Sequence, residues 1–461
     1  MPRISGRMAV LLGCLYICLT AGPLLGQDRA TCLHFFGQTS TPERFECISA
    51  LFSQAPIHAT LGNIAPSNGF PIGLVLEREY NDTNKQTGAS QSVSPSLTFV
   101  GSTNGSWGVH GEVDWFPPAV VSEKKSPHCY QFLHHCTTDP PLFILSGNYE
   151  SIQTLDFYGI GPVSPSTQFQ YGENQLVAGV HADIPLTNYL HFIGSTEGLK
   201  TQLKEETSAS SVNLNFTEGT APGLALQPAY VHSTAGLRFK TVYVHEAQDG
   251  SVAIKPRLTV SWNGKALYNW YSDVGHGAYS FQQFTFNSTG GDALVFQFGG
   301  INKKPGDSFA NKFFCGQKKE DRCDFGKLSL GTMLVLSRTT GANMVPFYNQ
   351  PTLGGSDINS LQSLRGYDNY RFRGPDAALV QVDYALTLRK PKTDWTLVGP
   401  YIFYDAGIVG VEAADLSIEH WRQDAGTGLF LKFVGNIVAE AYVAGGAGHG
   451  AHFGYSLNRF F

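Results

Sequence analysis

Strict alternation of apolar and polar residues is the feature of this sequence that most constrains its fold. In 106–116, SWGVHGEVDWF, Trp107 and Trp115 fall on one face of an extended segment, and Glu112 and Asp114 fall on the other. A period of two residues is typical of a β-strand whose two faces meet different surroundings. Similar segments occur at 71–80, 328–337 and 378–389, and they recur from about residue 57 to the last residue. The chain is therefore expected to be all-β.

Three features favour lipid, rather than a protein core, on the apolar side of these strands. The polar faces hold charges of both signs, as the wall of a watery lumen does. Aromatic residues occur at strand ends, as at Trp115, Trp395 and Tyr401, and the last alternating strand, HFGYSLNRFF, ends on Phe461. These features are typical of an outer-membrane β-barrel. The alternative is a secreted array of β-sandwiches, because soluble sheets alternate as well.

Composition and the N-terminal residues agree with export. Only 15% of residues are charged, below the quarter or so that is usual in soluble proteins. The net charge of −5 argues against a nucleic-acid partner. Arg3 and Arg7 precede the apolar stretch MAVLLGCLYICLTA, which predicts a signal peptide over 1–26. The alternative interpretation of LLGC, 11–14, is a lipoprotein cleavage box. Residues 27–56 are expected to form a short periplasmic or plug segment, and 57–461 the barrel.

The number of strand candidates is close to sixteen. They begin at about residues 57, 71, 92, 106, 142, 172, 188, 229, 252, 278, 327, 377, 399, 425, 436 and 451. One extra candidate, DALVFQFGG at 292–300, must merge with 278–286 or lie in a turn if the barrel has an even number of strands. This order places the connections 117–141 and about 301–326 at the same end of the barrel, in the periplasm.

Six cysteines remain after the signal peptide, in three close pairs, and disulfides are favoured in an exported chain. The predicted pairs are Cys32–Cys47, Cys129–Cys136 and Cys315–Cys323. The segment SPHCYQFLHHC adds His128, His134 and His135 to the middle pair, which suggests zinc as an alternative. The spacing fits no standard zinc pattern, so we predict a disulfide there and no metal site.

The stretch LGGSDINSLQSLRGYDNYRFRG, 353–374, resembles the sixth extracellular loop of the Omp85 superfamily of outer-membrane proteins. The resemblance rests on an aliphatic-Arg-Gly-aromatic tetrad, here Leu364, Arg365, Gly366 and Tyr367. FYDAG, 403–407, is similar to a second family motif, and FYGIGP, 158–163, resembles the bacterial surface-antigen branch. The resemblance spans about 57–461. It implies a transmembrane antiparallel β-barrel of about 16 strands, with its sixth extracellular loop folded inward, in the bacterial outer membrane.

The resemblance also implies how the loop is held. In the family, the loop arginine contacts acidic residues of the barrel wall. Alternation places Asp383 and Asp405 on the lumen side of neighbouring strands, so we expect Arg365 to bridge them with its forked guanidinium. Gly407 completes the second motif. Gly366 is expected to let the backbone turn sharply.

Residues outside the tetrad receive other roles. Tyr367 is expected to pack on the inner wall. Arg371 and Arg373 are expected to matter less than Arg365, because they lie outside the motif. Phe461 is expected to be the signal by which the barrel-assembly machinery inserts the chain.

The function that the resemblance implies is a pore, or a factor in outer-membrane protein insertion or translocation. Its partners would be outer-membrane lipid and unfolded outer-membrane proteins, and no cofactor is expected. Residues 27–56 are too few for the POTRA domain that relatives carry, so a passive diffusion channel with no assembly role is the alternative. An enzyme is not expected, since the sequence has no G-x-S-x-G and no H-E-x-x-H. GGAGHG, 445–450, lies between two strand candidates and is interpreted as a turn.

Overall fold

The computed structural model describes residues 57–458 with short gaps. The gaps are 62–63, 84–88, 121–127, 131–134, 138–139, 206–207, 247–253, 276, 290–292, 303–321, 359–360, 387–395, 434–436 and 447–449. The predicted signal peptide, the segment 27–56 and Phe461 therefore lie outside the described residues. Trp395, Cys32, Cys47 and Cys315 lie outside them as well.

The described chain consists almost entirely of strands. They are β1 (Ile57–Leu61), β2 (Pro71–Glu77), β3 (Tyr80–Thr83), β4 (Ala89–Ser102), β5 (Trp107–Val120), β6 (His128–Tyr130), β7 (His135–Thr137), β8 (Leu142–Phe157), β9 (Phe169–Pro185), β10 (Leu190–Leu203), β11 (Ala229–Glu246), β12 (Ile254–Asp273), β13 (Phe281–Asn287), β14 (Leu294–Asn302), β15 (Arg322–Thr339), β16 (Thr352–Leu353), β17 (Phe372–Arg373), β18 (Asp376–Ala385), β19 (Thr396–Gly410), β20 (Arg422–Phe433), β21 (Ile437–Gly446) and β22 (Ala451–Asn458). Helical turns are few: α4 (Val212–Asn215), η4 (Phe347–Asn349), η5 (Ala413–Asp415) and η6 (Ile418–His420). No helix in the described ranges is long and apolar enough to cross a membrane.

All strands except β16 and β17 belong to one 20-stranded sheet, and every register in it is antiparallel. β3 continues β2 along β4, and β6 and β7 form a small hairpin beyond β5. β13 and β14 both pair with β12 and with β15, so they occupy one place in the sheet. Sixteen strand positions therefore run from β1 to β22 in the described residues. The candidate at 292–300 is β14, which merges with β13 as one interrupted strand.

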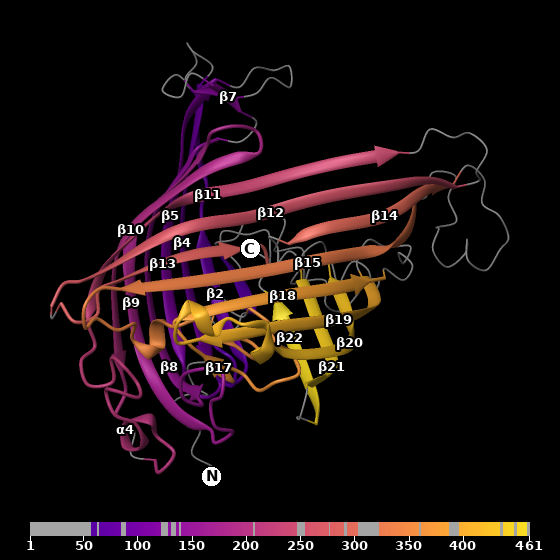
Figure 1. Ribbon diagram of the computed structural model, residues 1–461. Helices are drawn as coiled ribbons and strands as arrows, with labels where there is room; N and C mark the ends of the chain where they lie inside the picture. The colour runs from indigo at the N-terminus through magenta and orange to yellow at the C-terminus, as the bar shows by residue number, and fades with distance from the viewer. Residues whose placement is uncertain are drawn as a thin grey trace, which may run out of the picture.

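The sheet curls into a barrel with two different ends (Figure 1). The end that we call the loop end holds α4, the link 158–168 between β8 and β9, and the long loop 340–375 between β15 and β18. The β6–β7 hairpin extends from the opposite end (Figure 1). Strand β1 exists as expected.

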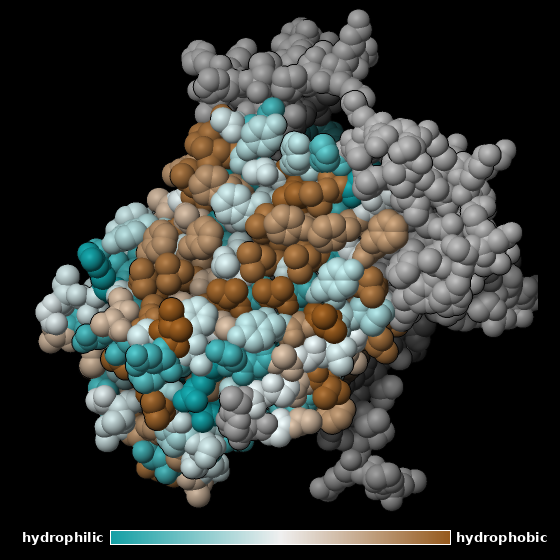
Figure 2. Space-filling model, turned by 45° about the vertical axis from the view of Figure 1, so that its right-hand side comes forward, coloured by the Kyte–Doolittle hydropathy of each residue, from teal (hydrophilic) through white to brown (hydrophobic). Residues whose placement is uncertain are grey.

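The outward side chains form two levels of aromatic residues. Trp107 and Trp115 on β5 are eight residues apart, as are Trp262 and Trp270 on β12, which corresponds to about 26 Å along a strand. Each contacts a neighbouring ring, with centroids 4.7 to 5.9 Å apart: Trp107–Tyr149, Trp115–Phe143, Trp262–Phe239 and Trp270–Tyr268. Figure 2 shows apolar side chains gathered over a broad area of the surface in view. A strand tilt of about 40° leaves roughly 20 Å between the two levels, close to the apolar band of a membrane barrel.

One aromatic residue faces the other way. Tyr401 is buried inside the barrel, where it packs near Phe403 and Phe430, so its expected place in an outer girdle was wrong. Its neighbours Ile402 and Tyr404 are the exposed ones on this strand. Tyr401 and Asp405 are four residues apart in one strand, so their side chains point to the same, inward face. An aromatic ring alone does not show which face a residue occupies.

Candidate functional site

The loop 340–375 turns back into the barrel and packs there. It carries the short hairpin of β16 and β17, and its apolar residues join wall residues in a buried cluster. That cluster contains Met333, Val335, Leu353, Leu364, Tyr367, Phe372, Ala377, Leu379 and Val409. The loop is therefore folded inward, as the motifs implied.

Arg365 makes the central polar contact of the loop. Its Nε donates to Asp405 Oδ2 at 2.9 Å, and its Nη2 donates to Asp405 Oδ1 at 2.7 Å. The same Nη2 donates to Asp383 Oδ1 at 2.6 Å. The guanidinium also lies over the ring of Phe403, 3.6 Å from its centroid. The structure thus brings together the three charged residues that the sequence predicted, with a two-pronged bond to Asp405.

The position of Asp383 and Asp405 follows from the sheet register. β18 and β19 pair so that Gln381 lies opposite Asp405 and Asp383 opposite Phe403. Asp405 is fully buried, whereas the Asp383 side chain is 33% exposed. Burial alone would lower the pKa of Arg365, but the bonds and charges of the two carboxylates raise its pKa overall. The pair with Asp405 is therefore the shielded and stronger one, because exposed charges are screened by water.

The glycine of the tetrad serves a different purpose from the expected one. The left-handed backbone conformation belongs to Leu364, with a φ of 45°, and Gly366 has an ordinary φ. A Cβ on Gly366 would lie 2.8 Å from Asp424 Cβ and 2.9 Å from the Gly446 nitrogen. Gly366 is therefore needed for close approach to β20 and β21, and the sharp turn is made one step earlier.

Tyr367 and Gly407 both lie where the loop packs on the wall. Tyr367 is almost fully buried, packs against Phe372, and donates from its hydroxyl to the Gln423 carbonyl at 3.3 Å. A Cβ on Gly407 would come within 3.0 Å of Leu353. Gly407 thus leaves room for the loop residue that packs over β19.

Arg371 and Arg373 are as buried as Arg365, although they lie outside the motif. They are 6% and 3% exposed, close to the 5% of Arg365. Arg371 donates to Ser164 Oγ at 2.8 Å and to the Ser164 carbonyl at 3.1 Å. Arg373 donates to the Phe347 carbonyl at 2.6 Å and to the Tyr171 hydroxyl at 3.3 Å. The sequence missed these contacts because the partners on β9 and in the link 158–168 are about two hundred residues away.

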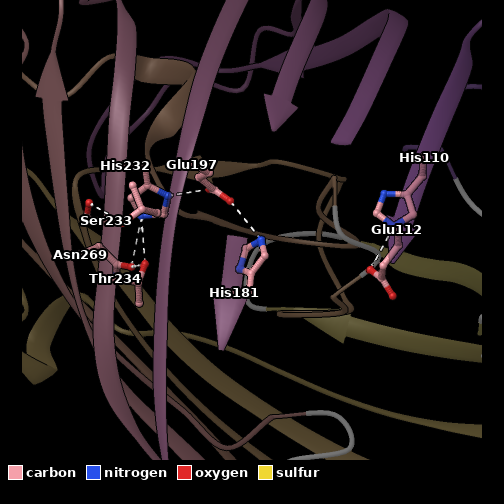
Figure 3. Close-up of polar contacts among 9 residues, drawn as sticks. His110, Glu112, His181, Glu197, His232, Ser233, Thr234 and Asn269 are labelled. Carbon is pink, nitrogen blue, oxygen red and sulfur yellow. Dashed lines mark hydrogen bonds and ion pairs between the residues drawn. The ribbon is translucent and has the colours of Figure 1, made fainter. Parts of the chain in front are cut away.

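A second group of polar side chains lies on the inner wall of the barrel (Figure 3). His232 Nδ1 lies 2.7 Å from Glu197 Oε1, and His181 Nε2 lies 3.5 Å from Glu197 Oε2. His232 Nε2 also lies 3.3 Å from Asn269 Oδ1. The residues come from the inward faces of β9 to β12. This wall can bond to water and polar solutes inside the barrel.

Three of the predicted cysteines can be placed. Cys129 and Cys136 are direct register partners in the β6–β7 hairpin, and Cys323 lies on β15. No cluster of three or more His, Cys, Asp or Glu side chains suited to a metal ion occurs within the described ranges. The disulfide pairings stay predictions.

The similarity of this chain to known proteins lies in structure rather than in sequence. No protein-family model matches the sequence, and no curated protein matches it significantly. Among solved structures it is similar to BamA from Haemophilus ducreyi lacking POTRA domains 1–3, at 13% identity and a TM-score of 0.43, over 94% of this chain and 82% of that chain. It is also similar to CdiB from Escherichia coli, at 12% identity and a TM-score of 0.43, over 94% and 74% of the two chains.

A third similar structure is CdiB from Acinetobacter baumannii, at 11% identity and a TM-score of 0.38. The similarity covers 87% of this chain and 58% of that one, so the chain spans less than two thirds of its length.

Proposed function

We propose that this chain is an Omp85-type outer-membrane barrel that acts as a pore, or in the insertion or translocation of outer-membrane proteins. The observation that carries the proposal is the loop arginine held inside the barrel. Arg365 donates hydrogen bonds of 2.6 to 2.9 Å to Asp405 and Asp383, and its guanidinium lies over the Phe403 ring. A long loop turned inward and fixed by a buried ion pair is costly to build, so it serves a purpose beyond closing a strand connection.

The outer surface supports a membrane location for this barrel. Two levels of aromatic rings flank exposed aliphatic side chains on β8 and β9, including Leu145 and Val180, which are 58% and 54% exposed. Lipid is the medium in which such a surface is stable. The partners proposed on this basis are outer-membrane lipid, unfolded outer-membrane proteins as substrates, and the assembly machinery that inserts the chain itself.

A passive diffusion channel is the second candidate. The polar inner wall around His181, Glu197 and His232 favours it, since a polar lumen lets hydrated solutes pass (Figure 3). The inward loop favours the first candidate, because it occupies the space that a diffusing solute needs.

The test uses purified protein in liposomes. Two quantities are measured: the ion conductance across the bilayer, and the folding rate of an unfolded barrel protein added from outside. Faster folding than in empty liposomes is the expected result and supports an insertion role, with Arg365→Ala as a variant that should lose part of the acceleration. Conductance without acceleration would support the diffusion channel. Failure to insert into the bilayer would overturn the membrane-barrel proposal.

A further inference from the structure

The loop 340–375 is fastened at two places on opposite sides of the barrel. Arg365 binds β18 and β19, whereas Arg371 and Arg373 bind the link 158–168 and β9. From β9 to β18 the sheet order runs through β10, β11, β12, the β13–β14 position and β15. The two attachment sites are therefore separated by nearly half of the sixteen strand positions around the barrel. The loop must cross the loop end from one wall to the other.

The second attachment site also combines hydrogen bonds with contacts to aromatic rings. In addition to its hydrogen bonds, the Arg371 guanidinium lies 5.0 Å from the Tyr158 ring. The Arg373 guanidinium lies 5.7 to 5.9 Å from the rings of Phe157, Tyr171 and Phe347. The backbones also join, because the Gly161 nitrogen donates to the Arg373 carbonyl at 2.7 Å.

The link 158–168 is itself part of the crossing. Arg422 at the start of β20 donates to the Pro162 carbonyl at 3.2 Å, so the link reaches toward the side that holds Arg365. Gly159 and Gly161 have φ values of 93° and 103°, which give the link the turns it needs. The FYGIGP stretch, 158–163, therefore has a physical role, because it contacts both the loop, through Gly161, and β20, through Pro162.

Apolar packing closes the space between these contacts. A buried cluster joins the link 62–70, the ends of β8 and β9, the 212–221 segment and the long loop. Its members are Ile64, Ala65, Val100, Ile152, Leu155, Phe157, Tyr171, Val212, Ala221, Phe347 and Tyr370. These segments come from separate parts of the sequence, so a packed apolar layer connects them at the loop end.

We propose that Arg371 and Arg373 form a latch with Ser164, Phe347 and Tyr171 that holds the long loop across the loop end and keeps this end closed to solutes. The latch is separate from the Arg365 site, which fixes the loop to the opposite wall. Releasing the latch frees one side of the loop while the other remains attached, so the end opens without loss of the barrel. This inference rests on the proposed membrane barrel.

The two attachment sites differ in their electrostatics. Arg365 has two carboxylate partners, whereas the hydrogen bonds of Arg371 go to the hydroxyl and carbonyl of Ser164. Burial accordingly lowers the pKa of Arg371. The charge of the Asp368 carboxylate offsets part of this effect. A guanidinium whose hydrogen bonds go to neutral oxygens is held less strongly than one hydrogen-bonded to two carboxylates. The latch is therefore the side of the loop that opens first.

The latch is tested by removing its two cations together. In planar bilayers, the double variant Arg371→Ala/Arg373→Ala is expected to raise the ratio of open time to closed time of the channel by about tenfold or more. Each of the two substitutions removes hydrogen bonds made by a charged group. The matched control is Arg338→Ala, an exposed arginine at the end of β15, which should behave like the unchanged protein. Conductance of the double variant equal to that of Arg338→Ala would overturn the latch.

A milder variant keeps the test decisive if the double variant fails to fold. Ser164→Ala/Tyr171→Phe removes two acceptors and leaves both arginines in place, and it should open the channel in the same direction to a smaller extent. A second measurement, proteolysis of the loop in detergent micelles, does not depend on a membrane. Faster cleavage within 340–375 than in Arg338→Ala supports the latch, and equal cleavage contradicts it. Absence of bilayer insertion by the unchanged protein would instead contradict the proposed function.

Discussion

At the scale of single residues, the bond between Arg365 and Asp405 is the one whose strength matters most. Asp405 is completely buried and also accepts a hydrogen bond from the Arg365 backbone nitrogen at 3.2 Å. Removing one partner of a buried pair strands the other charge, which typically costs about 3–5 kcal/mol. The nearby Asp383 side chain is partly exposed, so water lowers this figure here.

We predict that a double-mutant cycle between Arg365→Ala and Asp405→Ala yields a coupling free energy clearly different from zero. The free energy of loop release, measured from protease cleavage within 340–375, supplies the four corners of the cycle. Arg338→Ala paired with Asp405→Ala is the control and should show no coupling. Additive effects of Arg365→Ala and Asp405→Ala would mean that the two side chains do not act together.

We predict that Gly366→Ala loosens the loop although it changes only one methyl group. The added Cβ would meet the Gly446 nitrogen at 2.9 Å and the Gly445 carbonyl carbon at 3.1 Å, and backbone atoms cannot move away cheaply. Overpacking of this kind typically costs about 1–3 kcal/mol. Gly445→Ala is the matched control, because a Cβ there meets nothing within 4 Å. Equal thermal stability and equal loop cleavage of the two variants would contradict this role of Gly366.

At the scale of elements, the β6–β7 hairpin offers the clearest test of the predicted disulfides. Cys129 and Cys136 lie directly opposite each other, and opposed residues in antiparallel strands have Cα atoms about 4.5–5.5 Å apart, within the range of a disulfide. We predict that this pair is oxidised, which would stabilise the hairpin by about 2.5 kcal/mol in the chain-entropy model. Alkylation of the exported protein followed by mass spectrometry of this peptide checks it, with a reduced sample as control. Two free thiols in this peptide would contradict the prediction.

The strands and the inward fold of the loop could be predicted from the sequence, but the second attachment of the loop, through Arg371 and Arg373, could not. Alternation is a local pattern, so it predicts both the order of the strands and the inward orientation of Asp383 and Asp405. The merger of β13 and β14 depends on their shared partners β12 and β15, which no local pattern encodes. The burial of Arg371 likewise depends on Ser164, which the fold brings close from far along the chain. A residue in a loop shows its charge in the sequence, and only the fold shows what neutralises or buries it.

At the scale of the whole molecule, the question is whether lipid covers the outside of the barrel. Val180 and His181 on β9 offer a matched pair, because they are adjacent in sequence and lie between the two aromatic levels. Val180 points outward and is 54% exposed, whereas His181 points inward to Glu197. A charge placed at position 180 would therefore face the medium outside the barrel, and one placed at position 181 would face the lumen, at nearly the same depth.

We predict that Val180→Arg impairs membrane insertion and that His181→Arg does not. An arginine facing lipid costs about 2–4 kcal/mol at the midplane of a barrel and less toward the interfaces. An arginine at 181 faces a polar lumen, where Glu197 can pair with it. The measurement is the free energy of unfolding in liposomes, followed by denaturant titration and by the mobility of the folded form on gels. Equal stability of the two variants in liposomes would mean that the outer face does not lie in lipid. If Val180→Arg loses stability in liposomes but not in detergent micelles, where the arginine can reach water, the bilayer is the cause of the loss.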